Sequence, residues 1–119
     1  MATNVEIPLV LFTYIAPAVA ALTASGGTVA VNAALGNAFN YTVAASTTIS
    51  NPTNPVDGQV IRFRVTSGGS FATSWGTAYD FGTGVAPTLS ITSAKVDILA
   101  FEYVSSISKW CYLGAGIGF

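Results

Sequence analysis

The sequence predicts an all-β protein, a single-domain antiparallel sandwich or jelly-roll-like barrel of about eight short strands. Short runs of alternating or β-branched residues recur along the chain, and clusters of Gly, Pro, Asn and Ser separate them. Helix-compatible composition is confined to two short stretches, Ala16–Leu22 and Asn32–Leu35. A length of 119 residues suits one domain.

Alternation identifies the individual strands and their faces. The clearest is Gln59–Thr66, where Ile61, Phe63 and Val65 alternate with Arg62 and Arg64. The other expected strands are Thr28–Val31, Phe39–Val43, Thr47–Ile49, Phe71–Trp75, Tyr79–Phe81, Leu89–Ile91, Val96–Val104 and Lys109–Leu113. We expect Phe63, Phe101 and Trp110 to hold the core, and Ile98, Ala100 and Glu102 to share the opposite face of their strand.

The first 24 residues differ in composition from the rest, so we divide the chain into an apolar arm or strand (1–24) and a β domain (25–119). Ile7–Ala24 holds no charged residue over 18 positions, but two prolines interrupt it and no Lys or Arg flanks it, which disfavours a membrane span. The preceding MATNVE lacks the basic residues of a signal peptide. We expect a partner to bury this arm through Ile7, Leu9, Leu11, Phe12, Tyr14 and Ile15. A cleaved or membrane-inserted N-terminus is the minor alternative.

Charge and composition exclude several functions. Hydrophobic residues make up 51% of the chain and charged residues 8%, with four Lys plus Arg against five Asp plus Glu. Nucleic-acid binding and membrane anchoring by basic patches are therefore not expected. Histidine is absent and Cys111 is the single cysteine, so we expect no metal site, no cofactor and no Ser–His–Asp or Cys–His catalysis. A chain this apolar and close to neutral is expected to associate with itself or with other chains.

The remaining candidate residues have structural and functional interpretations. The carboxylates Asp80 and Asp97 could face each other as a catalytic pair or bind calcium, but Asp57 is explained by its turn and no calcium-loop motif is present. Trp75 and Tyr79 could form a face that binds host glycan or protein, although aromatics at strand spacing more often belong to a core. Arg62 and Arg64 could pair with Asp97 or Glu102 across strands or between subunits. Cys111 is expected to be a small buried hydrophobe.

Several segments resemble a β-rich module found in virion proteins of tailed bacteriophages, particularly those of actinobacterial hosts. The resemblance covers residues 16–119 and rests on Gly36–Phe39, Asn51–Gln59, Arg62–Val65, Thr88–Ser90, Val96–Asp97, Phe101–Tyr103, Lys109–Trp110 and Gly118–Phe119. The chain has no collagen-like repeat and no heptad stalk before the module, unlike long fibre proteins. The resemblance therefore implies a virion structural protein with no enzymatic activity.

Two locations in the virion are consistent with this resemblance. The first is a capsid decoration (cement) or short head-fibre protein, a homotrimer that binds and stabilises the major capsid protein on the outer surface of the head after assembly in the host cytoplasm. The second is a tail-tip or fibre-end module that binds the host surface through Trp75 and Tyr79. The apolar arm favours the first, because such a segment can add a strand to a partner or fill its groove.

Overall fold

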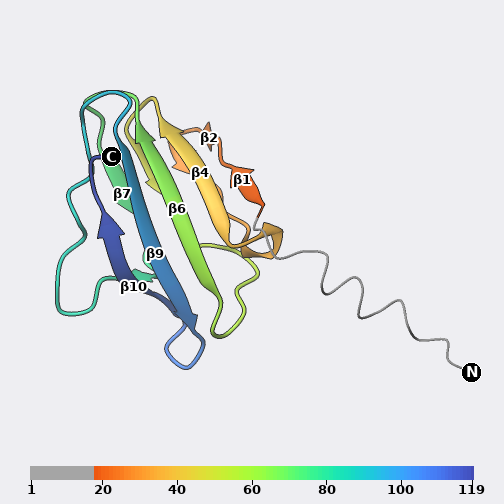
Figure 1. Ribbon diagram of the computed structural model, residues 1–119. Coiled ribbons are helices and arrows are strands. Elements are labelled where there is room, and N and C mark those ends of the chain that lie inside the picture. The colour runs from red at the N-terminus through yellow and green to blue at the C-terminus, as the bar shows by residue number, and fades with distance from the viewer. Residues whose placement is uncertain (1–17) are drawn as a thin grey trace, which may run out of the picture.

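A computed structural model of the protein describes residues 18–119, which fold into two packed β-sheets (Figure 1). The larger sheet has six strands in the order β1-β4-β6-β9-β10-β8, and the smaller sheet has four in the order β2-β3-β5-β7. The strands are β1 (Val19–Ala21), β2 (Ala24–Ser25), β3 (Thr28–Val29), β4 (Ala38–Val43), β5 (Thr47–Ile49), β6 (Val60–Ser67), β7 (Thr73–Trp75), β8 (Tyr79–Asp80), β9 (Val96–Val104) and β10 (Lys109–Gly116). The prediction of an all-β sandwich is confirmed.

Strand pairing is mixed, whereas the sequence predicted antiparallel sheets, and ten strands form in this part of the chain rather than about eight. β4 pairs in parallel with both β1 and β6, while β9 runs antiparallel to both β6 and β10. From β3 to β8 the chain alternates between the two sheets at every strand. The parallel pairs β3–β5, β4–β6 and β5–β7 are thus each connected through one strand of the opposite sheet, which supplies the crossover that parallel neighbours need. The parallel pair β8–β10 is instead connected through β9 of the same sheet.

Local differences from the predicted elements have physical reasons. Val19–Ala21, within a stretch of helix-compatible composition, is extended because it pairs with Ala38–Asn40 at the edge of the large sheet. Residues 18–24 therefore contribute to the sandwich although they were assigned to the arm. Leu89–Ile91 forms no strand, since Ser90 instead donates two hydrogen bonds to a carboxylate of β9. Ala33–Leu35 forms a single 3₁₀ turn, η1.

The hydrophobic core lies between the sheets and is largely aromatic at its centre. Phe63, Phe101 and Trp110 are at most 1% exposed, which confirms their predicted role. The Phe63 ring lies 5.6–5.9 Å between centroids from four other aromatic rings, those of Phe39, Trp75, Tyr79 and Phe101. Such edge and offset contacts add to the stabilisation that burial itself provides.

The turns follow the chemistry that the sequence indicates. Asp57–Gly58 forms a tight turn in which Gly58 has φ +82°, a conformation that glycine adopts without steric cost. Gly68 is required for a different reason, because a Cβ atom there would collide with the carbonyl oxygen of Val43. Both glycines lie at the ends of β6, the strand that joins the parallel and antiparallel halves of the large sheet.

Candidate interaction surface

The predicted docking residues Ile7, Leu9, Leu11, Phe12, Tyr14 and Ile15 lie outside the described residues, so the arm stays a prediction. The structure does define the place where this segment joins the sandwich. β1 follows it directly and occupies the edge of the large sheet beside β4.

The candidate aromatic face is not an exposed platform. Tyr79 is 6% exposed, and its hydroxyl donates a hydrogen bond to the Ser50 carbonyl oxygen at 2.9 Å. Burial raises the pKa of the Tyr79 hydroxyl above its usual value, because the charged phenolate would lose its hydration. Trp75 is half-buried and packs edge-on against Tyr79 with 5.0 Å between ring centroids. The expectation of exposure is therefore wrong for Tyr79, and the core interpretation accounts for this residue.

The carboxylates of the β domain serve structural roles that differ from a paired acid site. Asp97 is 1% exposed and accepts hydrogen bonds from Ser90 N (2.6 Å), Ser90 Oγ (2.7 Å) and Gly118 N (2.8 Å). Asp80 accepts from Gly82 N within its own turn, and Asp57 accepts from Ser105 N. Asp97 thereby fastens the loop after β8 and the end of the chain to β9.

The described part of the chain contains no cluster of metal-binding side chains, and its one cysteine is a free thiol. No group of three or more Cys, Asp or Glu side chains gathers there in a way that could hold a metal ion. Cys111 is a free thiol and is half-buried on β10, so it is less buried than the sequence predicted. It lies opposite Glu102 in the register of β9 and β10, on the side of the sheet that faces away from the core.

That side of the large sheet, here called the outer face, belongs to the larger of the two sheets. Its residues point away from the core on four long neighbouring strands and on β1. They are Val19, Ala21, Ala38, Asn40, Thr42, Val60, Arg62, Arg64, Thr66, Val96, Ile98, Ala100, Glu102, Val104, Lys109, Cys111, Gly114 and Gly116. Most of them are apolar or small, whereas the exposed side of a sandwich sheet ordinarily alternates to polar residues.

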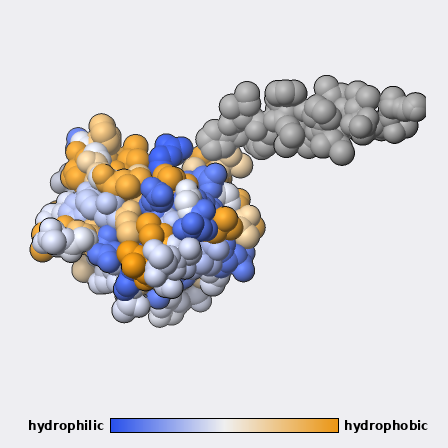
Figure 2. Space-filling model, turned by 90° about the horizontal axis from the view of Figure 1, so that it is seen from below, coloured by the Kyte–Doolittle hydropathy of each residue, from blue (hydrophilic) through white to orange (hydrophobic). Residues whose placement is uncertain are grey.

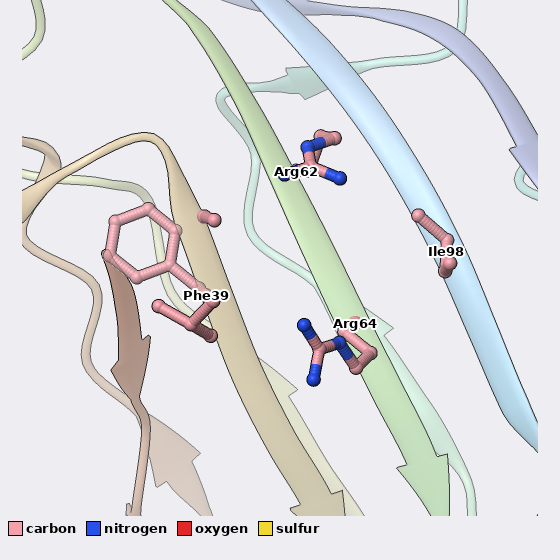
Figure 3. A pocket seen from close by; sticks show the side chains of 6 residues that line it. Phe39, Arg62, Arg64 and Ile98 are labelled. Atoms are coloured by element: carbon pink, nitrogen blue, oxygen red, sulfur yellow. The ribbon is translucent and has the colours of Figure 1, made fainter. Parts of the chain in front are cut away.

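Two arginines stand at the centre of the outer face. Arg62 and Arg64 project from the same side of β6, between Ala38 of β4 and Ile98 of β9 (Figure 3). They border a hollow of about 70 Å³ that Val19 also lines, which is far smaller than the pockets that enclose small-molecule ligands. The hollow has room for one small side chain, so this feature suits a protein partner better than a metabolite.

The strand faces show which of the two predicted carboxylates, Asp97 or Glu102, lies on the same side of the sheet as the arginines. Asp97 points into the sandwich and is occupied by neutral donors, so it is not their partner. Glu102 lies on the outer face with them, two residues along β9 from Ala100, which is the register partner of Arg62. Within residues 18–119, no opposite charge lies within 4.0 Å of either guanidinium group.

Two open apolar grooves flank the edge of the sandwich where the arm begins. One, of about 420 Å³, lies between Ala21–Ala24 and the β4 end at Tyr41–Ala45. The other, of about 330 Å³, lies on the far side of the same segment and is lined by Val31, Leu35 and neighbouring residues. Leu22 lines both grooves, so residues 20–24 form a narrow ridge between two apolar depressions.

Large hydrophobic side chains are exposed over much of the described surface. Figure 2 shows hydrophobic groups interspersed with hydrophilic ones on the face seen from below, toward the β9–β10 hairpin of Figure 1. The residues concerned are Val19, Leu35, Val56, Val60, Phe71, Val85, Ile91, Ile107, Leu113, Ile117 and Phe119. Phe119 is 68% exposed, and its ring lies against Gly116 at the rim of the outer face. Contiguous patches of such side chains mark surfaces that contact other proteins, whereas single ones are common on folded domains.

Sequence alternation located the individual members of the outer face but not the surface itself. The alternation in β6 and β9 correctly separated Arg62, Arg64 and Glu102 from the core residues. Their proximity depends on the β6–β9 register, which brings residues 40 positions apart in the sequence side by side. The parallel β4–β6 pair, which extends the face toward β1, had no signal in the sequence.

Comparison of the chain with models of protein families, with curated proteins and with solved structures found no match. Among the described residues, the structure contains no helix of the length and apolar character needed to cross a membrane.

Proposed function

We propose that this protein is a structural component of a bacteriophage virion, most simply a capsid decoration or short head-fibre protein that binds the major capsid protein and stabilises its lattice. The observation that carries the proposal is the apolar surface of the β domain. In residues 18–119, eleven large hydrophobic side chains are exposed, and most residues of the outer face are apolar or small. Surfaces of this kind suit adhesion to other proteins.

The chemistry of the described residues supports a mechanical role over a catalytic one. The carboxylates Asp57, Asp80 and Asp97 are each engaged in hydrogen bonds that hold a turn or a loop. The aromatic rings that could have bound a sugar pack against one another in the core. What remains available to a partner is extended sheet surface and the apolar grooves at the β1 edge.

The apolar arm is the element that we assign to the lattice. It leads into β1 beside the two grooves, so it can reach from this edge of the domain to a neighbouring capsid subunit. A segment of about nine residues spans roughly 30 Å when extended, enough to lie along a strand or groove of a partner. Each contact is modest, and many copies on one particle would together resist internal pressure.

The first test is to locate and count the chain on purified virions of the phage that encodes it, by cryo-electron microscopy and quantitative mass spectrometry. Hundreds of copies spread over the head are expected for a decoration protein. A handful of copies at the tail end would support the alternative, a tail-tip or fibre-end module that binds the host surface. Absence from the particle would overturn both assignments.

The second test uses the full-length chain with serine in place of Leu9, Leu11 and Phe12. If the arm docks on the lattice, this variant should lose binding to undecorated heads and retain the circular dichroism spectrum of the wild type. The matched control is Val85→Ser, which removes a hydrophobic side chain that is 88% exposed in a loop of the β domain. Full occupancy of heads by the triple variant would contradict the arm assignment.

A further inference from the structure

We infer that the outer face of the large sheet is covered by the same face of a second copy of this chain, with Arg62 of each copy paired to Glu102 of the other. The inference concerns the free protein and does not depend on where in a virion the protein acts. It begins from an imbalance on the surface. Two guanidinium groups stand together on a largely apolar sheet face, and within residues 18–119 no carboxylate, Glu102 included, lies within 4.0 Å of either.

Strand order makes this face complementary to itself. The arginines lie on β6 and Glu102 lies on the adjacent β9. A two-fold axis that runs along the strands between β6 and β9 places β6 of each copy over β9 of the other. Arg62 then faces Ala100 of the second copy and lies one residue pair, roughly 7 Å, from its Glu102. The long Arg62 side chain spans this offset, so both copies gain the same Arg62–Glu102 ion pair. Arg64 faces Ile98, about 13 Å along β9 from Glu102, and adds positive charge to the face without pairing to it.

The side chains around the charges permit close approach of two sheets. Ala38, Ala100 and Gly114 leave the centre of the face flat, and Ile98 and Val60 supply apolar contact beside the arginines. Packed sheets lie about 10 Å apart, a distance that small and medium side chains fill. Phe119, held against Gly116 at the rim, adds an exposed aromatic group of the kind that anchors interfaces.

The available area is sufficient for a specific dimer. The four long strands β4, β6, β9 and β10 contain six to nine residues each. At about 3.3 Å per residue and about 4.8 Å between strands, they and the short edge strands present roughly 600 Å². Two such faces bury about 1,200 Å² in total, which is the lower end of the range for stable protein–protein interfaces. We therefore expect a dimer that dissociates at low concentration.

Charge reversal provides a test that separates this interface from all others. The full-length double variant Arg62→Glu/Arg64→Glu carries three acids on the outer face beside Lys109, and Glu102→Arg leaves four bases and no acid there. Each variant alone should be monomeric at a concentration at which the wild type is dimeric, with the dissociation constant raised at least tenfold. An equimolar mixture of the two should restore the dimer, because an acidic face then meets a basic one. Mass by light scattering and a mass tag on one variant identify the mixed dimer.

The matched control is Lys95→Glu compared with Arg62→Glu, since both change the net charge by the same amount. Lys95 is exposed in the loop before β9. The interface predicts that Lys95→Glu remains dimeric while Arg62→Glu weakens association. Equal effects of the two substitutions would indicate a response to net charge alone and overturn the inference. A monomeric wild type at millimolar concentration, or a mixture that fails to associate although both variants keep the wild-type melting temperature, would also overturn it.

Discussion

Replacing Asp97 by asparagine should destabilise the fold more than any other substitution of similar size on β9. The Asp97 carboxylate is 1% exposed, and its two oxygens accept three hydrogen bonds, from Ser90 N, Ser90 Oγ and Gly118 N. These bonds fasten the loop after β8 and the end of the chain, which is also held by two backbone hydrogen bonds between Phe119 and Val96. An amide group is nearly the same size and shape as the carboxylate, so the substitution changes the donor and acceptor pattern and leaves the packing intact.

The expected cost follows from counting the bonds. If the asparagine amide oxygen takes the Oδ1 position, it still accepts the hydrogen bonds from Ser90 Oγ and Gly118 N. The amide NH₂ group then takes the Oδ2 position and faces the N–H of Ser90, two donors at a site where the donor–acceptor distance is 2.6 Å. One hydrogen bond to a carboxylate, worth about 1.5–3 kcal/mol, is lost, and the two that remain become weaker because the charge is gone. We expect a total loss of about 3 kcal/mol, which lowers the melting temperature of a domain of this size by about 10 °C.

Urea and thermal unfolding followed by circular dichroism, at one fixed protein concentration, measure this loss. The matched control is Asp57→Asn, which removes one hydrogen-bonded carboxylate at an exposed turn and should cost less than about 1 kcal/mol. Amide exchange at Ser90 and Gly118 should also accelerate in Asp97→Asn. A free energy of unfolding within about 0.5 kcal/mol of the wild type would refute the structural role that we assign to this carboxylate.

Three further predictions concern the core and a turn. Burial raises the pKa of Tyr79 in the folded state, so the neutral hydroxyl contributes fully to the free energy of unfolding below the unfolded-state pKa of about 10, and this contribution falls as the pH rises further. Tyr79→Phe should therefore reduce the loss of stability between pH 9 and about 12, measured by denaturation at a series of pH values. Gly68→Ala should cost about 2 kcal/mol or more because its Cβ would collide with the Val43 carbonyl, whereas Gly84→Ala, whose Cβ makes ordinary contacts, should be nearly neutral by the same melts. Phe63→Ala should cost about 3–5 kcal/mol in urea titrations, and equal stability of this variant and the wild type would contradict the aromatic core.

The β4–β6 pair of the large sheet shows most clearly what local sequence patterns predict and what they leave open. The alternation of Ile61, Phe63 and Val65 with Arg62 and Arg64 predicted both the strand and its two faces, because side chains alternate across any strand regardless of its neighbours. The same alternation carries no information on whether β4 lies parallel or antiparallel to β6. The chain crosses to the small sheet through β5 between them, and this connection makes the pair parallel.

The candidate surface, too, was predictable from the sequence only in part. The sequence predicted that Arg62, Arg64 and Glu102 face away from the core, and it left their partner open between Asp97, Glu102 and another subunit. Burial of Asp97 among three neutral donors removed the first choice. Tyr79 was a candidate for an exposed face because an aromatic residue on a two-residue strand has no local signal for burial. Only its packing against Phe63 and Phe101 places it in the core.

The sequence by itself determined the class of fold, the positions of the longest strands and the residues on each of their faces. It also excluded histidine chemistry and phosphate binding by basic patches, since composition alone settles these points. The tertiary structure decided which strands are neighbours, in which direction they run and which polar side chains are buried. The physical reason is that alternation and turn chemistry act over a few residues, whereas register, parallel pairing and burial arise from contacts between segments far apart in the chain.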